Sequence, residues 1–181
     1  MTMNKMPEST SIMVVDDTPA NLKLLQEMLQ AKGYLVLTFT RGASALKAVA
    51  KNPPDLILLD INMPEMNGFE VCERLKADEV LKDIPVIFIS ALTETADKIK
   101  AFAVGGVDYI TKPFQFEEVN ARVETHLRLR RQQLELQALN ELKNHLNPDI
   151  SPSRGGWLLS LFRSREALKS TGCSLPPKIY Q

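Results

Sequence analysis

One short apolar run constrains the fold of this chain more than any other feature. Residues 56–59 are four consecutive apolar side chains, preceded by two prolines and followed, after Asp60, by a turn at 62–64. A run of this length between turn signals is typical of a strand buried on both faces, as in a parallel sheet covered by helices. Ligands of such sheets gather at the carboxyl ends of the strands. We therefore expect Asp60 to lie where a ligand would bind.

Similar apolar runs alternate with amphipathic segments along the first two thirds of the chain. The apolar runs lie at 12–15, 35–39, 56–59, 86–89 and 107–110, and helical periodicity lies near 19–31, 42–51, 67–77 and 94–103. Five such units predict an α/β fold, a doubly wound five-stranded parallel sheet with right-handed crossovers. Thr18 is placed to cap the first helix, because Pro19 suits the first helical position.

The last helix is expected to be much longer than the others. No Gly or Pro occurs from Gln115 to Asn147, and roughly 30 residues at 1.5 Å each form a rod of about 45 Å, longer than a small α/β domain. An apolar stripe runs along this segment: Leu127, Leu134, Ala138, Leu142 and Leu146. The stripe predicts a two-helix coiled coil and hence a homodimer. Arg130 and Arg131 interrupt the heptads, and folding of the helix back onto its own domain is the alternative.

These patterns divide the chain into four parts. We expect a disordered N-terminus at 1–10, a globular domain at 11–128, a helical extension at 129–147 that could form the coiled coil, and a tail at 148–181. The tail contains several prolines and a Gly-Gly pair and is too short for an independent domain.

Composition argues against several classes of protein. Lys+Arg and Asp+Glu number 22 each, no segment has a dense basic patch, and the tail has no room for a usual helix-turn-helix domain. No apolar run approaches the roughly 20 residues that span a bilayer. Cys72 and Cys173 lack metal-ligand spacing and indicate a reducing compartment. We expect a soluble cytoplasmic protein that binds neither nucleic acid nor a membrane.

Asp60 has polar neighbours at the other predicted strand ends. Asp16 and Asp17 follow the first strand. Ser90 ends the fourth strand, and Lys112 follows the fifth. Three carboxylates that converge repel one another unless a cation offsets them, and oxygen donors without His or Cys select a hard ion such as Mg²⁺. A carboxylate nucleophile, Mg²⁺ and a lysine together predict a phosphoryl-transfer site.

Each of these residues also has an ordinary structural explanation when taken alone. Asp16 and Asp17 could cap the following helix, Lys112 could lie on the surface, and Ser90 could belong to a turn. Their joint occurrence at the carboxyl ends of strands favours a functional site.

The order and spacing of these residues resemble the receiver domain of two-component response regulators. The matching segments cover about residues 10–128 and are Val14-Val15-Asp16-Asp17, Asp60-Ile61-Asn62-Met63-Pro64 with Gly68, Ser90-Ala91, and Tyr109-Ile110-Thr111-Lys112-Pro113. The resemblance implies a flavodoxin-like sheet with strand order 2-1-3-4-5, followed here by an extended C-terminal helix. It also implies a cis peptide bond between Lys112 and Pro113.

The same resemblance implies how the acidic residues act. Asp60 would be the phosphoacceptor, which takes a phosphoryl group from a phosphohistidine of a sensor histidine kinase or of a phosphotransfer protein. Mg²⁺ would be the cofactor. Its ligands would be Asp60, Asp17, Asp16 (partly through water) and the backbone carbonyl of Asn62.

The remaining motif residues are implied to carry the signal onward. Lys112 would contact the phosphoryl oxygens, and Ser90 would hydrogen-bond the new phosphoryl group. Tyr109 would move inward behind Ser90 as the second switch residue. The fifth strand–helix unit leads directly into the long helix, so a changed receiver could alter how two such helices pair. His126 on that helix is expected on its polar face.

Two other functions remain to be weighed. An aspartyl-phosphate phosphatase would need a second Asp two residues after the nucleophile as general acid. Asn62 occupies that position and cannot donate a proton in this way, so we expect no enzyme beyond slow self-dephosphorylation. A receiver fragment of a larger protein, whose catalytic output domain (a cyclase, phosphatase or kinase) is missing, fits the sequence as well as a stand-alone receiver.

Overall fold

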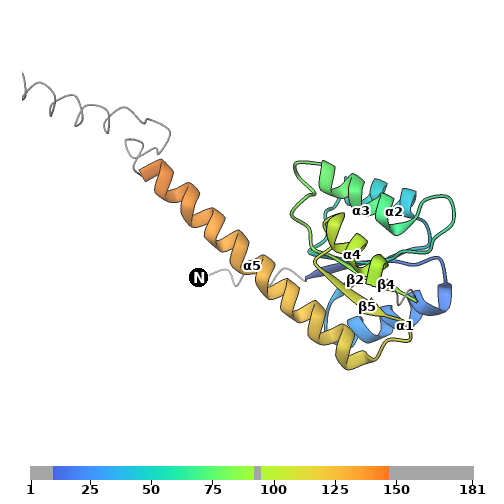
Figure 1. Ribbon diagram of the computed structural model, residues 1–181. Coiled ribbons are helices and arrows are strands. Elements are labelled where there is room, and N and C mark those ends of the chain that lie inside the picture. The colour runs from blue at the N-terminus through green and yellow to red at the C-terminus, as the bar shows by residue number, and fades with distance from the viewer. Residues whose placement is uncertain (1–9, 92–94, 147–181) are drawn as a thin grey trace, which may run out of the picture. The chain divides into compact units, whose positions relative to one another are not determined.

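The computed structural model describes residues 10–91 and 95–146. The elements in chain order are β1 (Ser11–Val15), α1 (Pro19–Gln30), β2 (Leu35–Phe39), α2 (Gly42–Val49), β3 (Leu56–Asp60), α3 (Gly68–Ala77), β4 (Val86–Ser90), α4 (Thr95–Ala103), β5 (Asp108–Thr111) and α5 (Phe116–Leu146) (Figure 1). The disordered N-terminus predicted at 1–10 (except Thr10) and the tail predicted at 148–181 lie outside the described residues.

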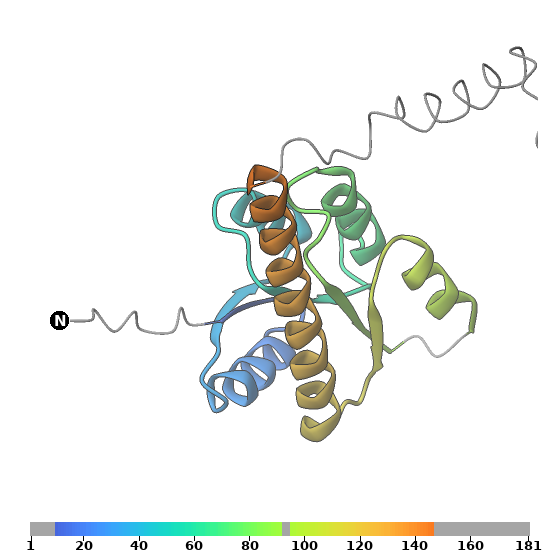
Figure 2. The same ribbon diagram turned by 90° about the vertical axis from the view of Figure 1, so that its left-hand side faces the viewer.

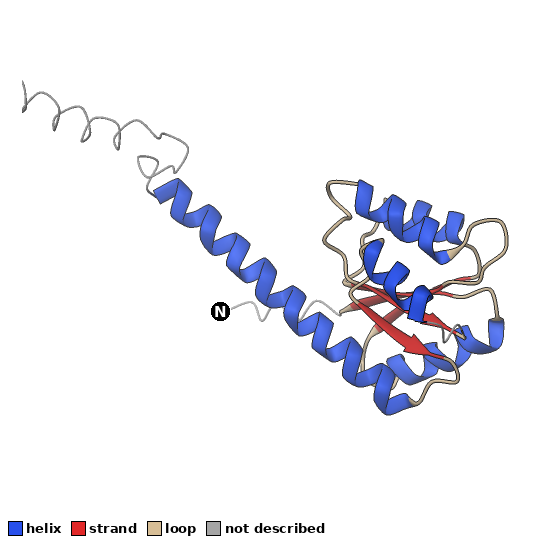
Figure 3. Cartoon of the chain, viewed as in Figure 1, coloured by secondary structure: helices blue, strands red, loops and turns tan. Residues whose placement is uncertain are grey.

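The strands, red in Figure 3, form one parallel sheet. Their order in the sheet is β2-β1-β3-β4-β5. This confirms the predicted doubly wound α/β fold and its flavodoxin-like strand order. Every residue of β3 and of β4 is buried, because helices cover both faces of the sheet. The prolines before β3 therefore bound a strand of the kind that its continuous apolar run predicted.

Successive side chains of each strand point to opposite faces and build two separate core clusters. Ile57 and Leu59 of β3 pack with buried residues of α2, α3 and α4. Leu56 and Leu58 pack on the other face with buried residues of α1 and α5. Figure 2 shows α1 and the first turns of α5 below the sheet, with α2 and α3 above it. The sheet is thus held between two helical layers, which fixes the positions of its strand ends.

Local signals set where the helices begin. Thr18 takes the N-cap position of α1 and Pro19 is its first residue, as predicted. The Thr18 side chain makes no capping hydrogen bond, however, and its hydroxyl instead donates to Asp17 at 3.2 Å. At α3 the caps are complete, because Asn67 and Glu70 each accept a hydrogen bond from the other's backbone N–H.

Helix α5 is 31 residues long, and the boundary between two units of the chain falls within it, between residues 135 and 136. Val119 and Val123 are fully buried in the first unit, and Leu127 packs partly against the same cluster. The predicted apolar stripe is therefore divided: Leu127 is partly covered, while Leu134 and Leu142 are 50% and 60% exposed. No helix within 10–91 and 95–146 is long and apolar enough to cross a membrane.

Candidate functional site

The predicted acidic residues come together at the carboxyl ends of β1 and β3. Asp16 and Asp17 follow β1, and Asp60 is the last residue of β3. Each offers a carboxylate oxygen, and these oxygens lie within 4.8 Å of one another. Asp16 and Asp60 are buried, at 2% and 4% exposure, whereas Asp17 is exposed. The cluster therefore opens toward solvent on the side of Asp17.

Lys112 reaches into this cluster from the loop after β5. Its Nζ lies 2.7 Å from Oδ2 of Asp16 and 3.2 Å from Oδ1 of Asp60. The backbone N–H of Lys112 donates to the carbonyl of Ser90 at 2.8 Å, and the Lys112–Pro113 bond is cis, as the resemblance implied. Burial alone would lower the pKa of Lys112, but the hydrogen bond to Asp16 and the charge of Asp60 outweigh it and raise the pKa. Lys112 is thus a positively charged bridge between two buried carboxylates.

Asp60 is the carboxylate that this environment disfavours in its charged form. Burial raises its pKa, the nearby Lys112 opposes the rise, and the charges of Asp16 and Asp17 add to it. A divalent cation beside Asp60 would offset the same repulsion. All the clustered donors are oxygens, which hard cations prefer, so this acidic pocket is chemically suited to hold such an ion.

Asp16 is held by more groups than sequence reasoning indicated. Its Oδ1 accepts from the Thr18 N–H at 2.8 Å, and its Oδ2 accepts from Lys112. The side-chain Nδ2 of Asn21 lies 3.1 Å from each of the two oxygens. No role for Asn21 was predicted from the sequence. The feature that could have indicated one is its position in the first turn of α1, which begins close to the end of β1, where Asp16 lies.

Ser90 and Tyr109, the two predicted switch residues, lie together inside the fold. Ser90 is fully buried at the end of β4, and Tyr109 in β5 is only 6% exposed. Burial raises the pKa of Tyr109, and a hydrogen bond with Ser90 opposes that rise. The ammonium of Lys98 on α4 lies 5.7 Å from the centre of the Tyr109 ring. Tyr109 is therefore buried beside Ser90 in this structure, and its inward movement on phosphorylation stays a prediction.

Asn62 lies in the loop between β3 and α3, and its side chain is exposed. This loop is tightened by two hydrogen bonds to the carbonyl of Ile61, from the N–H of Met63 at 3.1 Å and from that of Gly68 at 2.9 Å. The part of the Asn62 carbonyl in metal binding stays a prediction.

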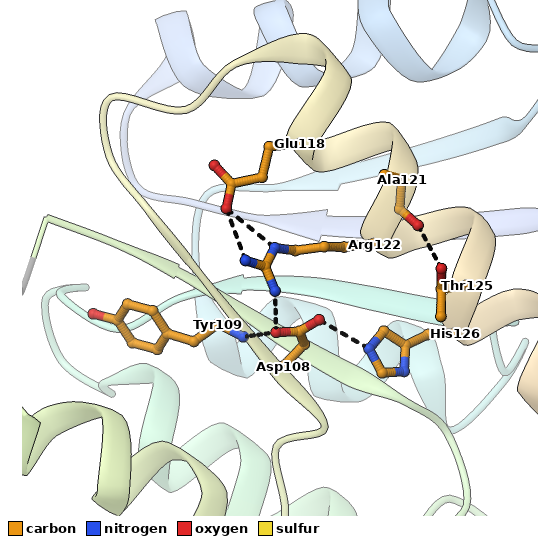
Figure 4. A network of polar contacts seen from close by, with 7 residues as sticks. All are labelled: Asp108, Tyr109, Glu118, Ala121, Arg122, Thr125 and His126. Atoms are coloured by element: carbon orange, nitrogen blue, oxygen red, sulfur yellow. Dashed lines mark hydrogen bonds and ion pairs between the residues drawn. The ribbon is translucent and has the colours of Figure 1, made fainter.

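A second polar cluster joins β5 to α5 beside Tyr109 (Figure 4). The carboxylate of Asp108 accepts from Arg122 Nη1 at 2.6 Å and from the Tyr109 N–H at 2.8 Å, and its other oxygen lies 3.0 Å from Nε2 of His126. Burial alone would raise the pKa of Asp108, but the hydrogen bonds from Arg122, Tyr109 and His126 outweigh it and lower the pKa. Arg122 also bonds Glu118, one turn earlier on α5.

His126 was expected on the polar face of the long helix, and it does contact a carboxylate. That face is not open to solvent here, because the His126 side chain packs against Asp108 of β5 and is only 15% exposed. The sequence signal was the four-residue spacing of Glu118, Arg122 and His126, which aligns the three side chains on one face of a helix.

Comparison with known proteins agrees with this geometry. Residues 12–124 match the family model of the response regulator receiver domain. The transcriptional regulatory protein KdpE of Mycobacterium tuberculosis is 33% identical over 177 residues, covering 90% of this chain and 77% of that protein. The response regulator PleD of Caulobacter vibrioides is 43% identical over 122 residues, covering 67% of this chain but 27% of PleD.

Solved structures give the same result. The chemotaxis protein CheY4 of Vibrio cholerae is 29% identical and superposes with a TM-score of 0.62, covering 65% of this chain and 98% of that chain. The family model alone matches more than half of the present chain, and it includes both β1 and β3 with their acidic ends. The chain therefore belongs to the response regulator receiver domain family of two-component systems.

Proposed function

We propose that this chain is a Mg²⁺-dependent phosphoacceptor of a two-component phosphorelay, in which Asp60 receives the phosphoryl group. The observation that carries the proposal is the meeting of three carboxylates at the carboxyl ends of the strands, two of which contact the Lys112 ammonium. Ligands of open α/β sheets bind at this edge. The donor would be a phosphohistidine of a sensor histidine kinase or of a phosphotransfer protein.

The chemistry follows from the placement of these groups. Asp16, Asp17, Asp60 and the carbonyl of Asn62 would hold Mg²⁺, which when bound offsets their charge and that of the phosphoryl oxygens. A carboxylate oxygen of Asp60 attacks the phosphorus; the new O–P bond forms as the N–P bond of the donor breaks, and the electron pair returns to the imidazole nitrogen. Lys112 then contacts a phosphoryl oxygen.

Asp60 is proposed to hold the phosphoryl group rather than to hydrolyse it rapidly. A hydrolase of the aspartyl-phosphate kind would place a general acid two residues after the nucleophile. Asn62 stands there and is exposed in the loop after β3, where it offers no proton. We infer that the protein is not an enzyme in the usual sense and loses its phosphate slowly.

The switch is proposed to run through Ser90 and Tyr109 to α5. A phosphoryl oxygen on Asp60 would compete for the Ser90 hydroxyl, which Tyr109 now engages. A shift of Tyr109 would also move Asp108, because the two residues are adjacent and the Asp108 carboxylate accepts a hydrogen bond from the Tyr109 N–H. Asp108 in turn holds Arg122 of α5. This chain of contacts supports transmission from the site to the long helix.

The phosphoacceptor proposal predicts a covalent adduct. Incubation with acetyl phosphate and Mg²⁺ is expected to add the mass of one phosphoryl group to the intact protein. The adduct should be absent from Asp60→Asn, whose amide is a poor nucleophile, and absent from wild type when a chelator removes the cation. Intact-mass spectrometry measures all three. An unchanged wild-type mass across donors and Mg²⁺ concentrations would rule the proposal out.

Dimerisation through α5 is the second element of the proposal. Leu134 and Leu142 are half or more exposed and lie two turns apart, at the eight-residue spacing of one helix face. Pairing with a second copy would bury both. We expect light scattering to give twice the mass of one chain for wild type and the single-chain mass for the double variant Leu134→Gln, Leu142→Gln.

The matched control for this prediction is Leu24→Gln on α1, which is 47% exposed and outside the stripe. It should leave the dimer intact. A single-chain mass for wild type would remove the coiled coil from the proposal.

A second candidate is the receiver part of a longer regulator. The observation that favours it is the coverage of PleD, of which the similar segment is 27%. In that case α5 would connect the receiver to an output domain, either catalytic or, as the name of KdpE suggests for that relative, one that regulates transcription. Sequencing the complete reading frame distinguishes the two candidates. The cytoplasmic location and the absence of nucleic-acid binding stay predictions.

A further inference from the structure

We propose that Asn21 is a positioning residue that fixes the orientation of the Asp16 carboxylate for cation binding. The inference rests on the proposed function, because it concerns the same acidic pocket. Asn21 is not among the motif residues that carry the family resemblance. The role proposed for it rests on its contacts: the side-chain nitrogen Nδ2 lies 3.1 Å from each of the two carboxylate oxygens of Asp16.

Without Asn21, Asp16 would keep one described donor on each oxygen. The Thr18 N–H serves Oδ1 and the Lys112 ammonium serves Oδ2. The lysine side chain is flexible, and its ammonium is shared with Asp60 at 3.2 Å. The carboxylate is only 2% exposed, so water is poorly placed to replace a lost donor. Asn21 therefore restrains rotation of the carboxylate in a way that the other two donors do not.

The amide is suited to this task because it is neutral. The Lys112 ammonium carries a positive charge beside Asp16, and an incoming cation must compete with it. Asn21 holds the same carboxylate by hydrogen bonds from a neutral group and leaves its negative charge available. Groups that orient a metal ligand in this manner typically affect metal affinity by about 10- to 100-fold when removed.

Asn21 also sits on a rigid element. It lies in the first turn of α1, where its N–H donates to the carbonyl of Thr18 at 3.1 Å. The helix is anchored to the sheet by Leu22 and Leu25, which are 7% and 0% exposed. Because Asn21 is held in place by the helix, it keeps the Asp16 carboxylate in the same orientation whether or not the cation is bound.

The test measures Mg²⁺ affinity directly. Isothermal calorimetry of the full chain is expected to give a Kd for Mg²⁺ about 10-fold higher in Asn21→Leu than in wild type. Leucine has the same number and branching of non-hydrogen side-chain atoms as asparagine but no hydrogen-bond donor. The control is Asn120→Leu on α5, whose Nδ2 donates to Glu124 at 3.0 Å, away from the acidic pocket, and which should bind Mg²⁺ as wild type does. Asn21→Ala replaces the leucine variant if circular dichroism shows that the latter does not fold.

A positioning role also predicts a split in kinetics. The Mg²⁺ concentration that gives half-maximal phosphorylation by acetyl phosphate should rise about 10-fold in Asn21→Leu, while the rate at saturating Mg²⁺ stays near that of wild type. Equal Kd values in wild type and both Asn21 variants would overturn the inference and leave the proposed function standing, and so would an equal loss in Asn120→Leu. A wild-type protein that binds no Mg²⁺ would overturn both.

Discussion

Replacing Lys112 by methionine is expected to slow phosphoryl transfer to Asp60 by about 100-fold or more, the usual cost of removing one group that stabilises developing charge. Methionine preserves much of the length of the side chain but removes the ammonium, which lies 2.7 Å from Asp16 and 3.2 Å from Asp60. The rate of adduct formation with acetyl phosphate at saturating Mg²⁺ measures the effect. Adduct formation at the wild-type rate would contradict the role assigned to Lys112.

The same substitution should destabilise the protein when Mg²⁺ is absent. Asp16 and Asp60 are buried, and Lys112 is the cation that both contact. Removing one partner of a buried ion pair typically costs about 3 kcal/mol or more of unfolding free energy. Urea unfolding should show this loss with a chelator and a smaller loss with Mg²⁺, since a cation that binds only the folded state stabilises it.

The control for both measurements is Lys23→Met. The Lys23 side chain is 78% exposed and pairs with Glu27 on the surface of α1, at 3.9 Å. Exposed pairs of this kind contribute about 0.5 kcal/mol or less. Equal losses in Lys23→Met and Lys112→Met would mean that the bridge between the carboxylates contributes little.

Replacing Gly68 by alanine is expected to lower the unfolding free energy by about 3 kcal/mol or more, at the upper end of the costs of overpacking. A Cβ at this position would lie 2.2 Å from the carbonyl oxygen of Asp60 and 2.9 Å from Cα of Ile61. Both contacts are with backbone, which cannot rotate away. Helix α3 begins at Gly68, so either the helix or the end of β3 must move.

Gly33→Ala provides the comparison for this prediction. Gly33 has a φ of 86° but no atom within 4 Å of an added Cβ, so alanine there meets only the backbone strain of the left-handed region, about 1 kcal/mol. Urea unfolding of the two variants separates steric overlap from strain. A Gly68→Ala protein with the same unfolding midpoint as Gly33→Ala would show that the contact with Asp60 relaxes freely. Phosphorylation of Gly68→Ala should also fall, because the overlap displaces Asp60.

The strands could be predicted from sequence because burial on both faces leaves little freedom in residue type. Residues 56–59 had to be apolar at every position, and their limits were marked by prolines and a turn. The strand ends then located Asp60, Asp16 and Lys112, and the structure brings all three together. The absence of Gly and Pro from Gln115 to Asn147 also predicted the long helix, which the structure describes as Phe116–Leu146.

Contacts that depend on how one helix lies on the sheet were beyond the sequence. Asp108 could equally have pointed to solvent, and only the placement of α5 brings Arg122 and His126 to it. Arg130 was taken as an interruption of the coiled-coil heptads. In the structure its Nη1 donates to the carbonyl of Asp83 at 2.5 Å, so the arginine serves the contact of α5 with its own domain. Spacing along a helix shows which side chains share a face, but not what that face meets.

The Lys112 ammonium gives the acidic pocket a resident positive charge. Because its own lysine partly offsets the charge of its buried carboxylates, this chain is expected to fold in the absence of a divalent ion, unlike small domains that are held together by their metal. Under the proposed function, the ion is then needed for phosphorylation of Asp60 and not for folding. Removal of Mg²⁺ is expected to leave the protein folded but unable to accept a phosphoryl group, and its return should restore phosphorylation without refolding.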